Sequence, residues 1–164
     1  MTEAAPTRRA INSRAEFHDA LRSAIGQAAD AQAMEIQLCD PDFADWPLGE
    51  RAVVEQLVRW AGPRRRLLVV AATFDEFARR HARWTEWRRA WSHVVECRVN
   101  DEVECEQFPS MCLVPGVMSV RMLDVVHHRG IASHDASDEQ ACREAIDAVS
   151  QRSMPAFPPT TLGL

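Results

Sequence analysis

The chain has 164 residues, of which 46% are hydrophobic and 26% are charged, a composition typical of one compact folded domain. All 19 basic residues are arginine and tyrosine is absent, which excludes chemistry that needs a lysine Schiff base, a phosphate-loop lysine or a phenolic acid. The formal net charge of -5 is unlike that of a general nucleic-acid binder, so we expect nucleic acid not to be a partner.

The two ends of the chain lack the periodicity of a stable element. We therefore expect flexible tails at residues 1–9 and 155–164 around a single domain over residues 10–154. The longest apolar run, Leu67 to Ala72, is too short to cross a bilayer, and no signal-peptide pattern opens the chain. The five cysteines never form Cys-x-x-Cys, which favours reduced thiols. These features predict a cytoplasmic protein with no membrane segment.

The first predicted elements are a helix and a strand. Ser13 and Glu16 form a capping box before a stripe of apolar residues from Phe17 to Ala28, which predicts a helix. Apolar and other residues then alternate from Met34 to Cys39 before Asp40 and Pro41, which predicts a half-buried strand.

Two helices and a buried strand are predicted next. Apolar residues between Val53 and Trp60 have helical spacing and are followed by Gly62 and Pro63, a helix stop. The continuous run from Leu67 to Ala72 is typical of a central strand covered on both faces. Thr73 and Glu76 form a second capping box, which predicts one long amphipathic helix reaching Trp91.

The second half has more strand patterns. Strands are predicted at Val94–Val99, Met111–Val114 and Met118–Val126, followed by a turn at residues 128–130. Ser137 with Gln140 opens a last helix with an inner stripe of Cys142, Ala145, Ile146 and Val149. This order predicts an α/β sandwich, a single domain with a mixed, mostly parallel sheet flanked by helices.

The third predicted helix contains the most unusual composition of the chain. Its arginines are interleaved with tryptophans, a combination that suits phosphate binding and base stacking. The candidate ligand-binding residues are Arg79, Arg80, Arg83 and Arg88. The alternative interpretation is structural, because Trp84, Trp87 and Trp91 fall on one stripe and would leave the arginines on a solvated outer face.

Histidines and carboxylates also gather in two places. His127, His128 and His134 lie near Asp135 and Asp138 and include metal-ligand types, but adjacent strand residues face opposite ways, so we expect no metal and no cofactor.

Three further carboxylates, Asp40, Asp42 and Asp45, follow the first strand, where α/β folds place functional loops. The favoured interpretation is structural, with Asp40 and Asp45 forming turns or capping a helix.

The layout of the chain resembles one half of the phospholipase D superfamily, a mixed sheet flanked by helices. That family carries His-x-Lys-x-x-x-x-Asp on a strand and a later serine. Here the corresponding stretch is Val117 to Asp124, followed by Ser133 and His134. Val117 stands in place of the histidine and Ser119 in place of the lysine. The resemblance therefore implies a degenerate, non-catalytic member, and single-half relatives of this kind often pair as dimers.

Three functions remain open from the sequence. The first is a non-catalytic domain that binds a protein partner or an anionic ligand, with Asp124, Ser133 and His134 added to the arginines as candidate binding residues. The second is a phosphodiester-directed enzyme that uses His127, His128 or His134. The third is a structural module that forms a homodimer.

Overall fold

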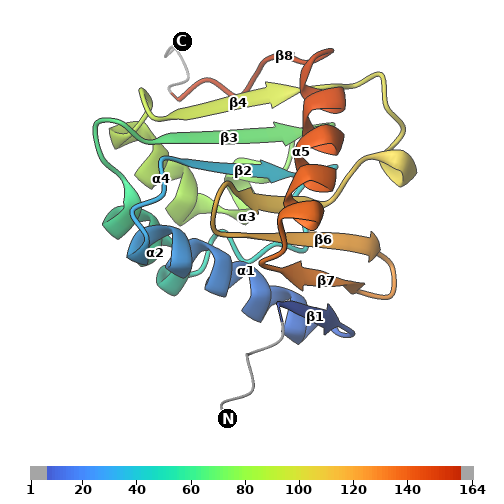
Figure 1. Ribbon diagram of the computed structural model, residues 1–164. Coiled ribbons are helices and arrows are strands. Elements are labelled where there is room, and N and C mark those ends of the chain that lie inside the picture. The colour runs from blue at the N-terminus through green and yellow to red at the C-terminus, as the bar shows by residue number, and fades with distance from the viewer. Residues whose placement is uncertain (1–6, 160–164) are drawn as a thin grey trace.

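The computed structural model describes residues 7–159, which form one sheet with helices on both faces (Figure 1). The helices are α1 (Arg14–Asp30), α2 (Arg51–Trp60), α3 (Phe77–Arg80), α4 (Ala82–Ala90) and α5 (Ala136–Ser150), with a short 3₁₀ turn, η1, at Cys105–Gln107. The strands are β1 (Arg8–Ile11), β2 (Glu35–Cys39), β3 (Arg66–Ala71), β4 (Val95–Val99), β5 (Met111–Val114), β6 (Met118–Asp124), β7 (Arg129–Ser133) and β8 (Met154–Pro155).

The strand order is β1-β7-β6-β5-β2-β3-β4-β8. Only the β2–β3 and β3–β4 pairings are parallel, and the other pairings in this order are antiparallel. The prediction of a mostly parallel sheet is therefore wrong. The cause is the second half of the chain, where tight turns join β5, β6 and β7 into antiparallel neighbours that extend the sheet from β2.

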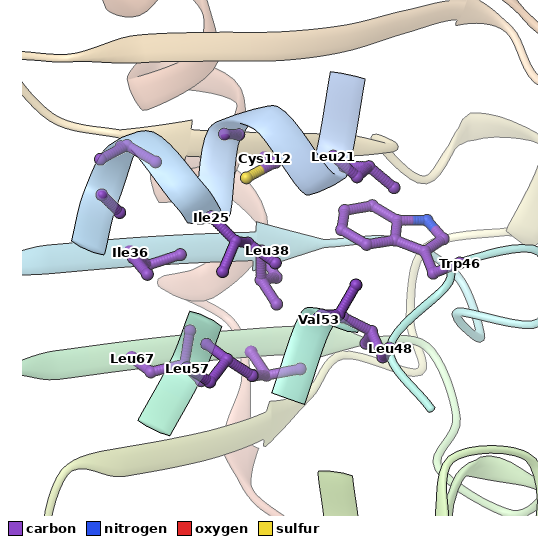
Figure 2. Close-up of a cluster of buried hydrophobic side chains, with 14 of the residues drawn as sticks. Leu21, Ile25, Ile36, Leu38, Trp46, Leu48, Val53, Leu57, Leu67 and Cys112 are labelled. Carbon is purple, nitrogen blue, oxygen red and sulfur yellow. The ribbon is translucent and has the colours of Figure 1, made fainter. Parts of the chain in front are cut away.

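The core lies in two layers, one on each face of the sheet. In β3, Leu67 and Val69 join the larger cluster beneath α1, α2 and α4, whereas Leu68 and Val70 join the smaller cluster beneath α5. Figure 2 shows the larger cluster, where Ile25 of α1 packs with Leu38 of β2. Burial of both faces explains the continuous apolar run of this strand, as predicted.

The predicted cap of the first helix forms. The amide of Glu16 donates to Oγ of the N-cap residue Ser13 (3.1 Å), and the Glu16 carboxylate accepts from the amide of Asn12 (2.9 Å), one residue before the N-cap. The strand after α1 is more buried than predicted, because Cys39 is covered by the α5 layer instead of facing solvent.

The long third helix is not continuous. It divides into α3 and α4 at His81, whose backbone has φ -125° and ψ 57°. The His81 side chain is buried, with Nε2 2.8 Å from the carbonyl oxygen of Phe43 and its ring against Phe77. Thr73 accepts from the amide of Asp75 instead of capping a helix. Tertiary contacts of one histidine therefore override the helical periodicity.

The predicted start of the last helix and the predicted tails also need correction. Helix α5 begins at Ala136 with Asp135 at its N-cap position, so Ser137 lies inside the helix instead of opening it, and the Asp135 amide donates to the hydroxyl of Ser133. Arg8 and Arg9, assigned to a tail, pair with β7 in β1.

Pro155, assigned to the other tail, pairs with Arg98 of β4. Residues 1–6 and 160–164 of these predicted tails lie outside the described residues. Within residues 7–159, no helix combines the length and apolarity that crossing a bilayer requires.

Candidate functional site

The loop that follows β2 is shaped by one buried carboxylate. Oδ2 of Asp40 accepts hydrogen bonds from the amides of Asp42 (3.2 Å) and Phe43 (2.7 Å). Oδ1 of Asp40 accepts from the hydroxyl of Ser110 (2.6 Å), which lies next to β5. Asp40 therefore forms a turn, as one sequence interpretation predicted, and it also joins the ends of two neighbouring strands.

Helix α1 holds the same loop through three side chains one helical turn apart. Nε of Arg14 lies 3.3 Å from Oδ1 of Asp45, and Nε2 of His18 lies 2.5 Å from the Asp45 carbonyl oxygen. Arg22 donates two hydrogen bonds to Glu50, at 2.9 and 2.8 Å. Such a bidentate pair fixes orientation as well as position. The loop between β2 and α2 is thus anchored along its length.

The turn between β6 and β7 reaches this loop from the other side. Nε2 of His128 lies 3.1 Å from Oδ2 of Asp45. His128 and Phe43 both adopt left-handed backbone conformations, with φ of 52° and 58°. Non-glycine residues rarely adopt positive φ, and such residues cluster at functional sites. The two segments therefore meet at a place where both backbones are constrained.

A pocket of about 290 Å³ lies between these segments, and we call it the β2-end pocket. Its lining comprises Phe17, Asp40, Pro41, Asp42, Ala44, Asp45, Trp46, Ser110, Met122, Val125 and His128. It lies where β2 ends, on the side of β5 and β6, since Ser110 directly precedes β5 and Met122 belongs to β6. Open α/β sheets bind ligands in the crevice outside the carboxyl ends of their strands, at a change in strand order.

The pocket has an acidic lining with contrasting carboxylates. Burial raises the pKa of Asp40, although hydrogen bonds from Ser110 and the Phe43 amide act in the opposite direction. Partial burial also acts to raise the pKa of Asp45, but hydrogen bonds from His128 and Arg14 outweigh it and leave that pKa below its usual value. The pocket therefore combines a buried acid with an ion-paired one.

The rim of this pocket is apolar. The hairpin tip, which we define as Leu123, Val125 and Val126, is exposed to 62%, 44% and 82% respectively. Leu123 lies at the register shift between Met122 and Asp124, and Val125 itself lines the pocket. Three exposed aliphatic side chains beside an acidic cavity form a surface that differs from the rest of the hairpin.

The sequence-predicted residues Asp124, Ser133 and His134 do not share this pocket. Asp124 accepts from the amide of His127 (3.1 Å) and so closes the hairpin turn. Ser133 lies at the other end of β7, where its hydroxyl donates to Asp138.

His134 contacts Gln27 (3.0 Å) and lines a second groove of about 620 Å³ between β1 and α1. The strand register therefore separates these residues instead of bringing them together.

The predicted arginine site is also dispersed. Arg79 pairs with Glu76, Arg83 donates to the carbonyl oxygen of Gly49 (3.2 Å), and Arg80 is exposed. Neither the β2-end pocket nor the β1–α1 groove is lined by any of these arginines.

The structural interpretation placed all of these arginines on a solvated outer face, but Arg88 does not face solvent. It is buried, donates to the carbonyl oxygen of Phe157 and lies 4.9 Å from the centroid of that ring. Arg88 therefore has a structural role.

The three histidines of the predicted cluster have different neighbours. His127 contacts Asp124, His128 contacts Asp45 and His134 contacts Gln27. In the described part of the chain, no group of three or more histidine, cysteine or acidic residues is placed to hold a metal ion.

Sequence reasoning did not identify Ser110, Trp46 or Phe17 as site residues. The available signal was Asp40, Asp42 and Asp45 directly after a strand, which we noted at a position typical of functional loops. The partners come from elsewhere, since Ser110 is 70 residues from Asp40 and His128 is 83 residues from Asp45.

Comparisons with known proteins establish a fold relationship. No protein-family model and no curated protein matches the sequence. Among solved structures, the chain is similar to TrmBL2, an archaeal chromatin protein whose structure shows a novel mode of DNA binding. The TM-score is 0.64 and the identity 12%, over 94% of this chain and 56% of that chain. The chain thus spans little more than half the length of that protein.

The second similar structure is Nuc, a phospholipase D family member from Salmonella typhimurium. Its TM-score is 0.51 and its identity 9%, over 82% of this chain and 90% of that chain. These likenesses support a phospholipase D-like α/β fold, and at such identities they define fold and not function.

Proposed function

We propose that this chain is a non-catalytic binding domain that docks a protein partner at the hairpin tip. The observation that carries the proposal is the exposure of Leu123 near the end of β6 and of Val125 and Val126 in the turn that follows. Exposed aliphatic clusters of this kind mark interaction sites in soluble proteins. His128 and Asp45 hold the turn in place, so a partner would meet a surface that is already organised.

The proposal includes that the chain is a degenerate relative of the phospholipase D superfamily. In such a relative Val117 and Ser119 replace the family's histidine and lysine, and no phosphoryl transfer takes place. Its support is the burial of Ser119 and the half-buried position of Val117 in the turn before β6. The lining of the β2-end pocket adds to it, since it contains no arginine that could bind a phosphodiester and the exposed Asp42 repels one. A phosphodiesterase that uses His128 is therefore the less favoured alternative.

The anionic-ligand version and the dimerisation alternative have less support. Arg79 and Arg89 are paired with Glu76 and Glu86, and Arg88 is committed to Phe157. A stable interface, with a partner protein or with a second copy, buries about 800 Å² on each side, so the contact must extend beyond the three residues of the tip.

The test compares proteins that co-purify with three tagged forms of the chain from the cells that produce it. The forms are wild type, Val126→Asp at the hairpin tip and Arg83→Glu on the exposed face of α4. We expect at least one protein to be retained by wild type and Arg83→Glu and reduced about tenfold by Val126→Asp, because a buried charge opposes an apolar contact. Equal recovery with all three forms would contradict the proposal, and recovery of a second copy of this chain would favour the dimer.

A further inference from the structure

The two edge strands of the sheet differ in how they are protected. At one edge, β8 has only two residues, and one of them is Pro155, which has no amide hydrogen to donate. At the other edge, β1 has four residues, contains no proline and pairs with β7 in an unbroken register (Figure 1). An edge strand presents unpaired backbone groups to which another chain can add a strand. The sheet can therefore be extended at β1.

The register of β1 identifies its free backbone groups. The amide of His134 donates to the carbonyl oxygen of Thr7 (2.7 Å), one position before the β1–β7 register begins. Hydrogen-bonded and non-hydrogen-bonded pairs alternate along an antiparallel ladder. The backbone groups of Arg9 therefore point to β7, whereas those of Arg8 and Ala10 point away from the sheet. Arg8 and Ala10 each offer an amide and a carbonyl oxygen to an added strand.

A groove of about 620 Å³ runs along this edge, between β1 and α1. On its helical side the lining residues recur about one turn apart and include Glu16, Ala20, Ser23 and Gln27. Ala20 and Ser23 are small, so the middle of the groove has room for other side chains. Alternate side chains of a strand point to the same face of a sheet. Every second side chain of a strand added to β1 would therefore enter the groove.

The free charge of the groove is positive. Arg9 lines the groove, is exposed and forms no ion pair within residues 7–159. The acids of the groove already accept hydrogen bonds from within the chain. Glu16 accepts from the amide of Asn12 (2.9 Å), and Asp19 accepts from the guanidinium group of Arg22 (2.7 Å). An acidic side chain opposite Arg9 would form a cross-strand pair of opposite charges, which stabilises a sheet.

A second copy of this chain fits the edge less well than an acidic segment. The antiparallel register that uses all of the free backbone groups places Arg8 of one copy opposite Ala10 of the other. The same register places Arg9 directly opposite Arg9. Like charges in this position destabilise a strand pair.

We infer that an extended, acidic segment of a partner protein adds to β1 as an antiparallel strand. Its central carboxylate faces Arg9 in the groove, and the residues on either side exchange backbone hydrogen bonds with Arg8 and Ala10. In strand addition, the backbone hydrogen bonds provide affinity and the alternate side chains provide specificity. This surface contains no residue of the hairpin tip, so the inference does not depend on the proposed function.

The test follows the backbone amide signals of the isotope-labelled full chain by NMR. The probe is the blocked pentapeptide Thr-Val-Glu-Val-Thr, and the control carries N-methyl groups on both valines, which removes the donors that face β1. With the unmodified peptide we expect saturable shifts and slower hydrogen exchange at the amides of Arg8 and Ala10. With the N-methylated peptide we expect neither effect.

The charge is tested with Arg9→Gln and with Arg64→Gln, a control at an exposed arginine before β3. Arg9→Gln should weaken binding of the peptide by about threefold, as expected for a solvent-exposed ion pair, and Arg64→Gln should leave it unchanged. Replacing the peptide's glutamate with glutamine should have the same effect as Arg9→Gln. Equal binding by wild type and Arg9→Gln would overturn the acidic assignment.

Three results would overturn strand addition itself. The first is no saturable shift at Arg8 and Ala10, and the second is equal binding of the N-methylated peptide. The third is protection of these two amides that rises with chain concentration in the absence of peptide, which would assign the edge to a second copy. Shifts confined to the hairpin tip would count as the first result and would leave the proposed function standing.

Discussion

The β2-end pocket and the arginine segment, which we define as α3 and α4 together, differ in how their charges are held. In the arginine segment, Arg79 and Arg89 form exposed pairs with acids three residues away. In the pocket, Asp45 is held by Arg14 of α1 and His128 of the hairpin, which are far apart in the chain. Local pairs stabilise a helix surface, whereas convergent long-range contacts build a defined site.

Arg88 is the exception in the arginine segment and gives the largest expected effect. Arg88→Ala removes a buried cation that donates to Phe157 and leaves a cavity beside its ring. We expect a loss of about 2–4 kcal/mol in the free energy of unfolding, against less than about 0.5 kcal/mol for exposed Arg83→Ala. Urea denaturation measures both. Equal losses would contradict the division of the segment into a buried and a solvated part.

The hairpin itself depends on Gly130 in β7. A Cβ atom at this position would lie 2.3 Å from the carbonyl oxygen of Arg121 in β6, a backbone atom that cannot move aside alone. Gly130→Ala should therefore cost about 1–3 kcal/mol and separate the two strands. Urea denaturation gives the cost, and amide hydrogen exchange in β6 locates it. As a control, Ala132→Gly in the same strand should leave Arg121 protected, and an unchanged Gly130→Ala hairpin would contradict the close packing.

Asp45 gives a smaller, pH-dependent effect. Its folded pKa lies below the unfolded value of 3.8, so its stabilisation is fully present above that value and is lost as the pH falls through the folded pKa. Asp45→Asn should lower stability by up to about 1 kcal/mol at about pH 6, because the pair is partly exposed. Urea midpoints should converge with those of wild type as the pH falls below the folded pKa of Asp45. If the stability difference between Asp45→Asn and wild type does not shrink as the pH falls, the substitution has removed packing contacts and not a charge interaction.

Of the effects predicted here, binding of the chain to duplex DNA is expected to be the weakest. Arg79 and Arg89 of the arginine segment are paired with acids and Arg88 is buried, which leaves Arg80 and Arg83 without an acidic partner among the described residues. We therefore expect at most weak, salt-sensitive binding, with a dissociation constant above about 10 μM at physiological salt. Gel-shift titrations at low and high salt measure it. Tighter binding that Arg80→Glu weakens would instead align the chain with its DNA-binding structural neighbour.

The sequence predicts single helices and strands better than it predicts the contacts between them. The capping box at Ser13 and the buried strand β3 could be predicted because hydrogen bonds and apolar patterns within a few residues determine them. The break at His81 could not, since it depends on the carbonyl oxygen of Phe43, 38 residues away.

The candidate site could not be predicted for the same reason, because it depends on contacts between residues far apart in the chain. Asp124, Ser133 and His134 lie close in sequence, but the antiparallel register of β6 and β7 sends them to opposite ends of a hairpin. The pocket residues Asp45 and His128 meet only because the β2–β5–β6–β7 order brings their loops to one edge. Antiparallel neighbours of this kind are not specified by the periodicity of any one segment.

The most direct test of partner docking places a photo-activated cross-linker at single positions in the two regions. One position is Val126 at the hairpin tip, and the other is Arg83 in the arginine segment; both are exposed, so the two reagents have equal access to solvent. We predict that a partner protein is cross-linked from position 126 and not from position 83. Cross-linking from position 83 alone, or from neither position in cells that produce the protein, would contradict docking at the hairpin tip.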